Sequence, residues 1–320
     1  MEFSRRNFLK GGLAAAGALA LGGLLPSQEL FAAGGRRRNS CRGKAKRVLL
    51  ISLDGICVEG FKQAETPHLD KMLAEGVVSE TTRVVMPSVT LPNWTSHLTG
   101  SGPEQHGVTD NGWTLDKHKL PGISKDAEGY YPSVFAVLKE KMPQIKTAFY
   151  YNWEPLFYPY NPKCLDEANC LENDAYVLNY EKAFDFMDKN RQAPALVFLY
   201  SVHTDHAGHK YKWMSPEYIR SIEEADAEIG KLLEKMRQAD LYDDTHFFFL
   251  TDHGGIGRGH GGVSTHEMIV PWGIAGPGIA EGVKMEEANN TVNTAAVILS
   301  LFGVDKPDAW TGEVPETIFK

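Results

Sequence analysis

Acidic and imidazole side chains gather directly after an apolar run at residues 246–262, HFFFLTDHGGIGRGHGG. The run ends in Asp252 and His253, and His260 follows on a glycine-rich turn. Glycine permits positive φ angles and close backbone approach, so side chains on either side of such a turn can converge. An Asp after a strand more often caps the next helix. A functional site here therefore needs partners from elsewhere in the chain.

Three further segments offer such partners. RVLLISLDGI ends in Asp54, and ALVFLYSVHTDHAGH carries Asp205 with His209 four residues later. MPSVTLPNWTSHLTG places the hydroxyl of Thr90 just before a helix expected over residues 93–98. Alone, Thr90 would be a helix-entry residue, and Asp205 with His209 would be a surface pair at helical spacing. The recurrence of these residue types in four segments favours one shared site.

Carboxylates and imidazoles in this combination are ligands for divalent cations. A mixed set of Asp and His suits zinc, and two such sets suit a pair of zinc ions. Manganese or iron can occupy the same donors. The sequence therefore predicts a metal centre to which three carboxylates and at least three imidazoles contribute.

The segments belong to a chain in which apolar runs alternate with amphipathic helical patterns, as in βαβ units. Strands are expected at RVLLISLD, VVSETTRVV, TAFYYN, ALVFLYSVHTD, HFFFLTDHGG and EMIVPWGIAG. Helices are expected at TPHLDKMLAEG (ended by Gly76), PSVFAVLKEKM, NDAYVLNYEKAFDFMDKN, SPEYIRSIEEADAEIGKLLEKMRQADL and NNTVNTAAVILSLFG. We predict a single α/β domain with a doubly wound, mostly parallel sheet and helices on both faces. Ligands bind beyond the carboxyl ends of the strands in such sheets.

The first residues have the pattern of an export signal. SRRNFLK is followed by GGLAAAGALALGGLL, an apolar run too short to span a bilayer. The pattern resembles a bacterial twin-arginine signal, whose export machinery carries folded proteins. We expect a signal peptide over residues 1–34, a basic linker over 35–45 and a domain over 46–320. The protein would be periplasmic or extracellular, with the twin-arginine machinery as its export partner and no permanent membrane anchor.

Net charge and cysteine content bear on the partners of the protein and on its disulfide bonds. The formal charge is −8 and the basic residues crowd the N-terminus, which argues against a nucleic-acid-binding module. Cys164 and Cys170, in PKCLDEANCLEN, flank a short polar loop and could close a disulfide in an oxidising compartment. Cys57 follows a strand and is expected to be a small buried side chain. Cys41 lies in the predicted linker.

Taken in order, the motifs D…T-x-P-N…D-x-x-x-H…DHG…H resemble the alkaline phosphatase superfamily, most closely its nucleotide pyrophosphatase/phosphodiesterase branch. The likeness extends over residues 46–320. It implies an alkaline-phosphatase-like three-layer α/β/α sandwich, a catalytic domain with two zinc ions, and a hydrolase acting on small-molecule phosphate esters. In that branch a long insertion usually separates DHG from the last histidine. Here only a few residues do so, and the subdomain that covers the substrate is missing.

The resemblance also implies how the metal ligands divide. One metal ion would be held by Asp54, Thr90, Asp252 and His253. The other would be held by Asp205, His209 and a third histidine. In GHGGVSTHEMIVPWGIAGPG the family's HG…M…GP pattern puts His260 in that place, and His266 is the alternative.

The same resemblance implies a mechanism. Thr90 would be the nucleophile and would carry a phospho-threonine intermediate, its hydroxyl activated by metal coordination. Asn93 would donate an amide hydrogen bond to a non-bridging phosphate oxygen, in addition to capping the following helix. Asp110 and Asn111, in GVTDNGW, would contribute to the pocket, as the corresponding loop does in relatives.

A phosphodiester is the favoured substrate. Sulfatases of this superfamily need C/S-x-P-x-R where this chain has TLPN. Phosphomonoesterases commonly set an Arg or an extra metal against the dianion, and Arg258 is the candidate here. A phosphomonoesterase or phosphonate hydrolase on the same scaffold is the alternative, and a metal-binding protein without turnover ranks lower. The aromatic segment 149–162, FYYNWEPLFYPYNP, either walls the pocket or packs around a long loop.

Overall fold

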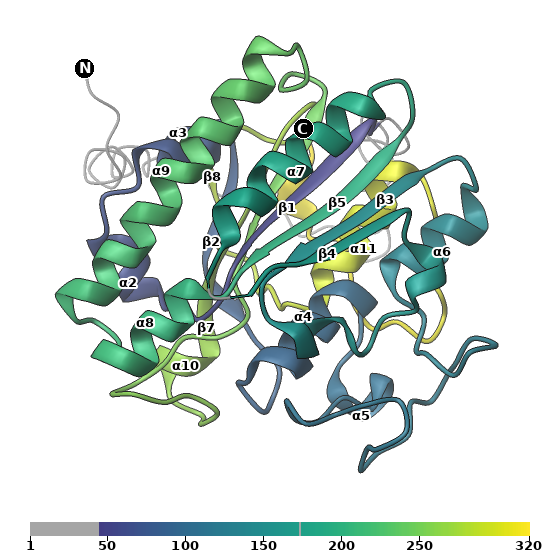
Figure 1. The fold of residues 1–320 in the computed structure, drawn as a ribbon, viewed down its shortest axis with the longest axis horizontal. Coiled ribbons are helices and arrows are strands. Elements are labelled where there is room, and N and C mark those ends of the chain that lie inside the picture. Colours follow the sequence, from purple (N-terminus) through teal and green to yellow (C-terminus); the bar gives the residue numbers. More distant parts are fainter. Residues whose placement is uncertain (1–44, 173) are drawn as a thin grey trace, which may run out of the picture.

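The computed structural model describes residues 45–172 and 174–320 (Figure 1). The predicted signal peptide, nearly all of the predicted linker and Cys41 lie outside these residues. The strands are β1 (Arg47–Leu53), β2 (Gly76–Arg83), β3 (Lys146–Tyr151), β4 (Glu167–Cys170), β5 (Ala195–Ser201), β6 (Thr245–Leu250), β7 (Ile269–Ala275) and β8 (Val283–Lys284). The α-helices are α2 (Val58–Gln63), α3 (Pro67–Ala74), α4 (Thr90–Thr99), α5 (Pro103–His106), α6 (Val134–Lys141), α7 (Tyr176–Lys189), α8 (His203–Tyr211), α9 (Pro216–Gln238), α10 (Thr265–Met268) and α11 (Asn293–Phe302). Short 3-10 helices are η1 (Glu154–Phe157), η2 (Pro162–Cys164) and η3 (Glu316–Ile318).

Within the described residues, eight strands form one sheet in the order β4-β3-β5-β1-β6-β7-β2-β8. The strands from β4 to β6 are parallel to one another, and β7 runs antiparallel to both of its neighbours. Strand β1 lies between β5 and β6, and every residue of these three strands is buried. Such continuous apolar strands are typical of a sheet covered on both faces. The prediction of a mostly parallel α/β sheet is confirmed.

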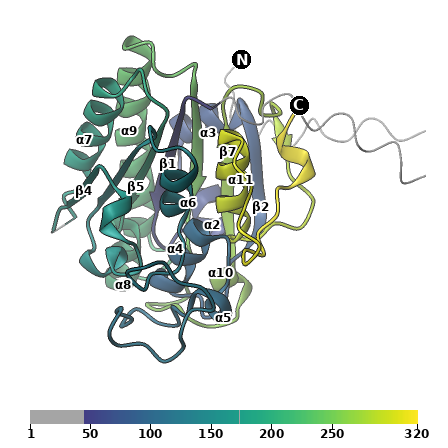
Figure 2. The same cartoon turned by 90° about the vertical axis from the view of Figure 1, so that its right-hand side faces the viewer.

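Helices cover both faces of the sheet, which gives three layers (Figure 2). Helices α4, α6 and α11 pack on one face, where Trp94, Leu138 and Ile298 belong to one continuous core. Helices α2, α3, α7 and α9 pack on the other face, where Phe61 and Ile222 belong to a second core. The sheet is therefore packed on both faces, and the loops at the carboxyl ends of its strands can hold reactive groups in fixed positions.

Two predicted boundaries near the expected site are wrong. Helix α4 begins at Thr90, three residues before the expected start, because its first turn tolerates Pro92. Strand β5 ends at Ser201, and α8 already begins at His203. Asp205 and His209 are thus successive-turn neighbours on a helix, and Asp205 is not the end of a strand.

A third predicted boundary, at Gly76, is also wrong. Gly76 does not end the preceding helix but is the first residue of β2. A Cβ atom at this position would lie 2.0 Å from the carbonyl oxygen of Ile274 on β7. The glycine is therefore required for close strand approach.

The disulfide considered between Cys164 and Cys170 is absent, and both residues are free thiols. Cys170 lies opposite Tyr151 at the end of β3, whereas the carbonyl of Cys164 accepts a hydrogen bond from the hydroxyl of Thr147 near its start. At roughly 3.3 Å per residue these positions are about 13 Å apart along the strand. A disulfide requires Cα atoms within about 7 Å, so the fold keeps the two thiols apart.

Candidate metal-dependent active site

Three carboxylates lie together where neighbouring strands end. Asp54 directly follows β1, Asp252 follows the end of β6, and Asp205 lies in the first turn of α8 after β5. Strands β5, β1 and β6 are adjacent and end at nearly the same level, with Leu53 opposite Ser201. Asp54 and Asp252 are completely buried, and Asp205 is 6% exposed. The sheet register thus brings together three acids that are far apart in sequence.

Each carboxylate retains one oxygen that forms no hydrogen bond with the described residues: Oδ1 of Asp54, Oδ1 of Asp205 and Oδ2 of Asp252. Burial, and then the charge of Asp205, raises the pKa of Asp54 to about 8. Burial raises the pKa of Asp205 to about 7. Burial, followed by the charge of Asp54, holds the pKa of Asp252 well above its ordinary value. Buried carboxylates at such close range are stable as anions only beside compensating positive charge, and the free oxygens fit a cation site.

The opposite oxygens of two of these carboxylates are held by hydrogen bonds. Oδ2 of Asp54 accepts hydrogen bonds from the hydroxyl of Tyr200 at 2.6 Å and from the indole N–H of Trp94 at 3.2 Å. Oδ1 of Asp252 accepts one from the backbone N–H of Gly55 at 3.1 Å. Hydrogen bonds of this kind orient metal ligands and leave the remaining oxygen for the cation.

Three histidines present the same ring nitrogen to the carboxylates. The Nδ1 atoms of His253, His260 and His209 lie 2.8 to 3.0 Å from backbone carbonyl oxygens of Gly254, Ser88 and Arg258. A carbonyl can only accept, so each Nδ1 must carry the proton and each Nε2 is left with a lone pair. Burial, followed by the charge of His260, lowers the pKa of His253 well below its usual value. The neutral imidazole is the form that binds metal.

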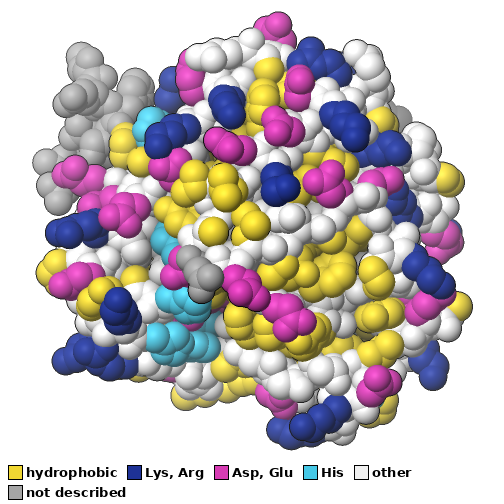
Figure 3. All heavy atoms as spheres, in the orientation of Figure 1, with side chains coloured by type: hydrophobic (Ala, Val, Ile, Leu, Met, Phe, Trp, Pro, Cys, Tyr) yellow, Lys and Arg dark blue, Asp and Glu magenta, His cyan; other side chains and the backbone are white. Residues whose placement is uncertain are grey.

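The ligand atoms meet in two groups, Asp54 with Asp252 and His253, and Asp205 with His253 and His260. Within each group the atoms lie within 4.8 Å of one another. Nε2 of His209 lies 3.4 Å from Oδ2 of Asp205, beside the second group. His209 is partly exposed, and Figure 3 shows histidine side chains at the surface in the region of α8. These donors fit two neighbouring divalent cations, and their mixture of carboxylate and imidazole suits zinc.

Thr90 is the first residue of α4 and is 5% exposed. Its Oγ1 lies 3.3 Å from Nε2 of His253, the histidine that belongs to both ligand groups. The helix N-terminus adds a partial positive charge at the same point, which favours negatively charged groups. The threonine hydroxyl therefore faces both the ligand groups and a position suited to an anion.

The structure separates the two candidates for the third histidine. His260 stacks on His253 with ring centroids 3.8 Å apart, and its Nε2 lies 3.7 Å from Oδ1 of Asp205. His266 instead pairs with Glu59, with Nδ1 3.4 Å from Oε2, and its side chain is 48% exposed. His260 is in the cluster and His266 is outside it.

The role expected for Asn93 does not fit its contacts. Its side chain is completely buried, and its amide nitrogen donates to the carbonyl oxygens of Pro87 and Val89, both at 2.9 Å. Its Oδ1 accepts from the N–H of Val85 at 2.8 Å. Both amide protons are thus committed to the loop before Thr90. Asn93 shapes this loop and has no proton left for a substrate oxygen.

Asn111 is better placed for that role, although its sequence context indicated only a general place in the pocket wall. Its Oδ1 accepts a hydrogen bond of 2.8 Å from the backbone N–H of Leu91, the residue after Thr90. Its amide nitrogen has no hydrogen-bond acceptor among the described residues. An unpaired donor thus lies beside the start of α4, where Thr90 is the first residue. The neighbouring Asp110 forms an ion pair with Lys119 at 2.9 Å.

Arg258 is engaged elsewhere. Its guanidinium donates a 3.1 Å hydrogen bond to the backbone carbonyl of His209, and its own carbonyl accepts from the His209 ring. It therefore stabilises the end of α8.

The aromatic segment 149–162 mainly packs within the hydrophobic core. Phe149 and Tyr160 are buried, with ring centroids 5.3 Å apart.

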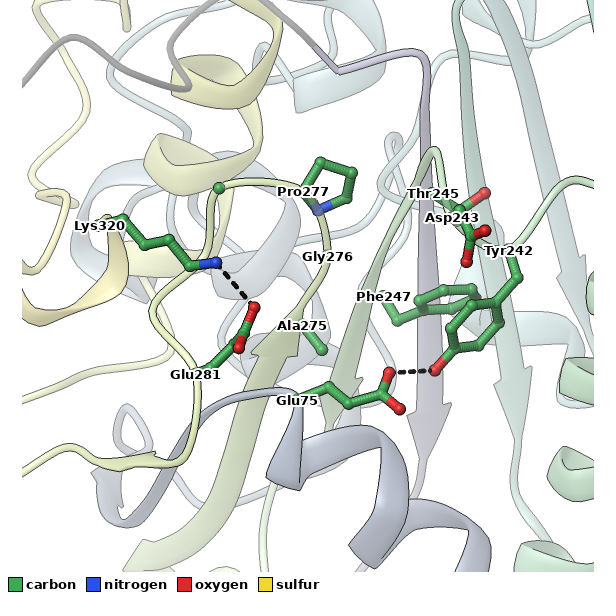
Figure 4. Close-up of a pocket in the computed structure, with 11 residues that line it drawn as sticks. Glu75, Tyr242, Asp243, Thr245, Phe247, Ala275, Gly276, Pro277, Glu281 and Lys320 are labelled. Carbon is green, nitrogen blue, oxygen red and sulfur yellow. Dashed lines mark hydrogen bonds and ion pairs between the residues drawn. The ribbon is translucent and has the colours of Figure 1, made fainter.

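A separate cavity of about 330 Å³ lies at the opposite edge of the sheet, near the start of β6 and the end of β7 (Figure 4). Its polar side chains pair with one another, Glu75 with the hydroxyl of Tyr242 and Glu281 with Lys320. None of the cluster residues lines it. The site is defined by the carboxylates and histidines at the other edge.

The fold and the site together define an α/β protein with a candidate metal site at the carboxyl ends of its parallel strands. Residues 48–267 match the type I phosphodiesterase/nucleotide pyrophosphatase family model, and the chain belongs to this family. Residues 2–22 match the twin-arginine translocation signal, so the chain is exported to the periplasm or beyond by that machinery. No helix in the described part of the chain is long and apolar enough to cross a membrane.

Several curated proteins are similar in sequence. The chain is 26% identical to the bis(5'-adenosyl)-triphosphatase ENPP4 of Bos taurus over 234 residues. This alignment covers 69% of this chain and 50% of that protein. It is 28% identical to an uncharacterised pyrophosphatase/phosphodiesterase of Schizosaccharomyces pombe, over 69% of this chain and 47% of that protein. The chain thus spans about half the length of these relatives.

Solved structures share the fold. Murine ectonucleotide pyrophosphatase/phosphodiesterase 5, in an inactive form in complex with AMP, superposes with a TM-score of 0.70 at 14% identity. The superposition covers 84% of this chain and 97% of that one. The human counterpart gives the same TM-score. The alkaline-phosphatase-like architecture inferred from the motifs is thereby confirmed.

Proposed function

We propose that this chain is a phosphodiesterase that depends on two divalent metal ions and acts through a phospho-threonine at Thr90, with residues 46–320 as its catalytic domain. The main support is the 3.3 Å approach of Thr90 Oγ1 to Nε2 of His253, which belongs to both ligand groups. A threonine hydroxyl is a weak nucleophile at neutral pH and requires an activating environment. The donor set around Thr90 offers such an environment.

In this proposal the metal ions are zinc. The first would be held by Asp54, Thr90, Asp252 and His253, and the second by Asp205, His209 and His260. Bound there, the ions would lower the pKa of the Thr90 hydroxyl and offset the negative charge on the transferring group. The unpaired carboxylate oxygens and the Nε2 lone pairs support this assignment.

The remaining chemistry belongs to the chain. Oγ1 of Thr90 attacks phosphorus and forms a P–O bond as the bond to the leaving alcohol breaks, and the alcohol departs with a proton. The phosphoryl group on Thr90 keeps the second alcohol of the diester as an ester. Water then attacks this phosphorus, which returns Thr90 as a hydroxyl and releases a phosphate monoester. The amide of Asn111, unpaired beside the nucleophile, would donate to a non-bridging oxygen in both steps.

Charge favours a diester. A phosphodiester carries one negative charge, whereas a monoester carries nearly two at neutral pH. Among the described residues, no lysine or arginine pairs with Asp54, Asp205 or Asp252, and Arg258 contacts the His209 carbonyl. The relatives named as bis(5'-adenosyl)-triphosphatases support including nucleotide pyrophosphates among the substrates.

The test compares three chromogenic esters with the zinc-loaded mature protein: bis-p-nitrophenyl phosphate, p-nitrophenyl phosphate and p-nitrophenyl phenylphosphonate. Thr90→Ala is the control, with circular dichroism to show that it folds. We expect diester preference and loss of activity in Thr90→Ala. In rapidly quenched reactions with the diester, mass spectrometry should find Thr90 carrying a phosphoryl group that retains one p-nitrophenyl ester.

Each other outcome would overturn a stated part of the proposal. Preference for the monoester or the phosphonate would assign the chain to one of those hydrolase classes. Full activity in Thr90→Ala would exclude the phospho-threonine. Two bound metals with no hydrolysis of any ester would indicate a binding protein without turnover.

A further inference from the structure

Ser88, two residues before the nucleophile, joins the Thr90 loop to the loop that carries His260. Its side chain is completely buried. Its hydroxyl donates a 2.7 Å hydrogen bond to the carbonyl of Gly262 and accepts one of 3.1 Å from the N–H of Gly261. Its own carbonyl accepts from Nδ1 of His260 at 3.0 Å. One serine thus makes three hydrogen bonds to three successive residues.

The other side of the same loop is held by Glu267. Its carboxylate accepts hydrogen bonds from the N–H of Gly262 at 2.8 Å and from the hydroxyl of Ser264 at 2.6 Å. The space is narrow: a Cβ on Gly261 would lie 3.2 Å from Val89, and one on Gly262 would lie 2.7 Å from Glu267. The loop is therefore confined between the nucleophile segment and α10.

The contacts of Ser88 bear directly on His260. The hydrogen bond to the Ser88 carbonyl fixes which ring nitrogen carries the proton, and it leaves Nε2 directed at Asp205, 3.7 Å from Oδ1. The His260 ring stacks on His253, whose Nε2 lies 3.3 Å from Thr90 Oγ1. Movement of this loop would therefore change the distance between the second ligand group and the nucleophile.

We propose that Ser88 is a positioning residue that sets the second cation group at a fixed distance from Thr90. The inference rests on the proposed function for its catalytic consequence, but the effect on metal binding does not require turnover. The positioning depends on the Ser88 hydroxyl, because only the hydroxyl bonds Gly261 and Gly262, whereas the Ser88 carbonyl bonds His260 alone. Loss of the hydroxyl releases the loop, and His260 then binds the second cation less tightly.

The test measures zinc binding to Ser88→Ala and Ser88→Thr by competition with a chromophoric chelator. We expect two sites in the natural protein, with one site weakened 10- to 100-fold in Ser88→Ala, the size of effect typical for groups that orient metal ligands. Ser88→Thr keeps the hydroxyl and should restore most of the affinity. In the diester assay, kcat should fall more than KM changes.

Ser133→Ala is the matched control. Ser133 is also buried and its side chain also accepts a backbone hydrogen bond, in this case from Ala136 at the start of α6 and not from a residue of the site. This variant should bind both cations like the natural protein. If Ser88→Ala fails to fold, Ser88→Cys takes its place, because it keeps the side-chain shape and weakens both hydrogen bonds.

The readouts separate this inference from the proposed function. Unchanged affinity at both sites in Ser88→Ala, or in Ser88→Cys where that variant is used, would overturn the inference whatever the activity. Equal loss in Ser88→Thr would overturn the role of the hydroxyl. If the natural protein hydrolyses no ester, yet Ser88→Ala weakens one cation site, the proposed function would be wrong and the inference supported.

Discussion

The hydroxyl of Tyr200 on β5 donates a 2.6 Å hydrogen bond to Oδ2 of Asp54 at the end of β1. Trp94 donates to the same oxygen from α4, on one face of the sheet. The two donors hold the carboxylate by one oxygen and leave the other unpaired beside Asp252 and His253. Two side chains of the buried core thus orient a carboxylate of the candidate metal site.

Tyr200→Phe should weaken zinc binding by about 10- to 100-fold, because Asp54 loses its shorter hydrogen bond while the ring continues to fill the core. Chelator competition measures this affinity. Tyr150→Phe on β3 is the control, since that tyrosine is equally buried and its hydroxyl forms no hydrogen bond with any described residue of the site. Its zinc affinity should match that of the natural protein. Equal affinities in all three proteins would show that the hydrogen bond has no orienting role.

Asp54→Asn should stabilise the metal-free protein and abolish its response to zinc. Without cations, burial and the charge of Asp205 raise the pKa of Asp54 to about 8, so folding at neutral pH must protonate a carboxylate that is ionised in the unfolded chain. Asparagine avoids this cost and should raise stability by about 1–3 kcal/mol. For a domain of this size that is roughly 3–8 °C in Tm. Differential scanning calorimetry in chelator, and then with added zinc, measures both effects. A lower Tm for Asp54→Asn in chelator would contradict the electrostatic account.

The two asparagines near Thr90 should give opposite phenotypes. Asn111→Ala removes the unpaired donor and should lower kcat for the diester by about 10²- to 10³-fold with little change in stability. Asn93→Ala removes three buried hydrogen bonds and should cost about 2–4 kcal/mol of unfolding free energy. Urea unfolding and steady-state kinetics on both variants distinguish the roles. A stable but inactive Asn93→Ala would reverse our assignment.

Buried histidines away from the metal ligands should make the fold sensitive to acid. Burial lowers the pKa of His97 to about 4 and that of His106 to about 3. An unfolded histidine titrates near 6.5, so between these values the unfolded chain binds protons that the native state does not. Their contribution to stability is therefore complete above about pH 6.5 and is lost as the pH falls.

His106→Gln tests this dependence. Nδ1 of His106 accepts from the N–H of Val108, and the ring also pairs with the hydroxyl of Ser96, so a second ring proton has no acceptor. In chelator, the loss of unfolding free energy from pH 6.5 to 4.5 should be shallower in the variant by about 1.4 kcal/mol per pH unit. Urea unfolding at several pH values gives the slopes. Parallel slopes would assign the acid sensitivity to other groups.

Most of the site could be predicted because its ligands follow strands. Asp54 and Asp252 come directly after buried apolar runs, and their location at one sheet edge followed from the parallel arrangement alone. Asp205 was expected at the end of a strand and lies on a helix, but the helix begins at the same edge. The error in secondary structure therefore did not move the residue away from the site.

The finer contacts could not be predicted, since they depend on the path of loops. Residue type alone does not show that both amide protons of Asn93 meet the carbonyls of Pro87 and Val89, while those of Asn111 remain free. The contact of Ser88 with Gly261 and Gly262 is likewise a meeting of segments more than 170 residues apart in the chain. Strand β8, with two residues, exists through its pairing with β2 and has no sequence pattern of its own.

The sheet order has a consequence for how the protein acquires its metal. Strand β1 pairs with β5 and β6, so that Arg47 lies opposite both Ala195 and Thr245. The first ligand group is complete only when the segment after β6 has joined β1, and the second only when that segment has also met the start of α8 after β5. A nascent or unfolded chain thus has no preformed centre to load. Twin-arginine export carries folded proteins. If the site binds metal as proposed, it is therefore complete before export, and the ions available in the cytoplasm would influence which metal occupies it.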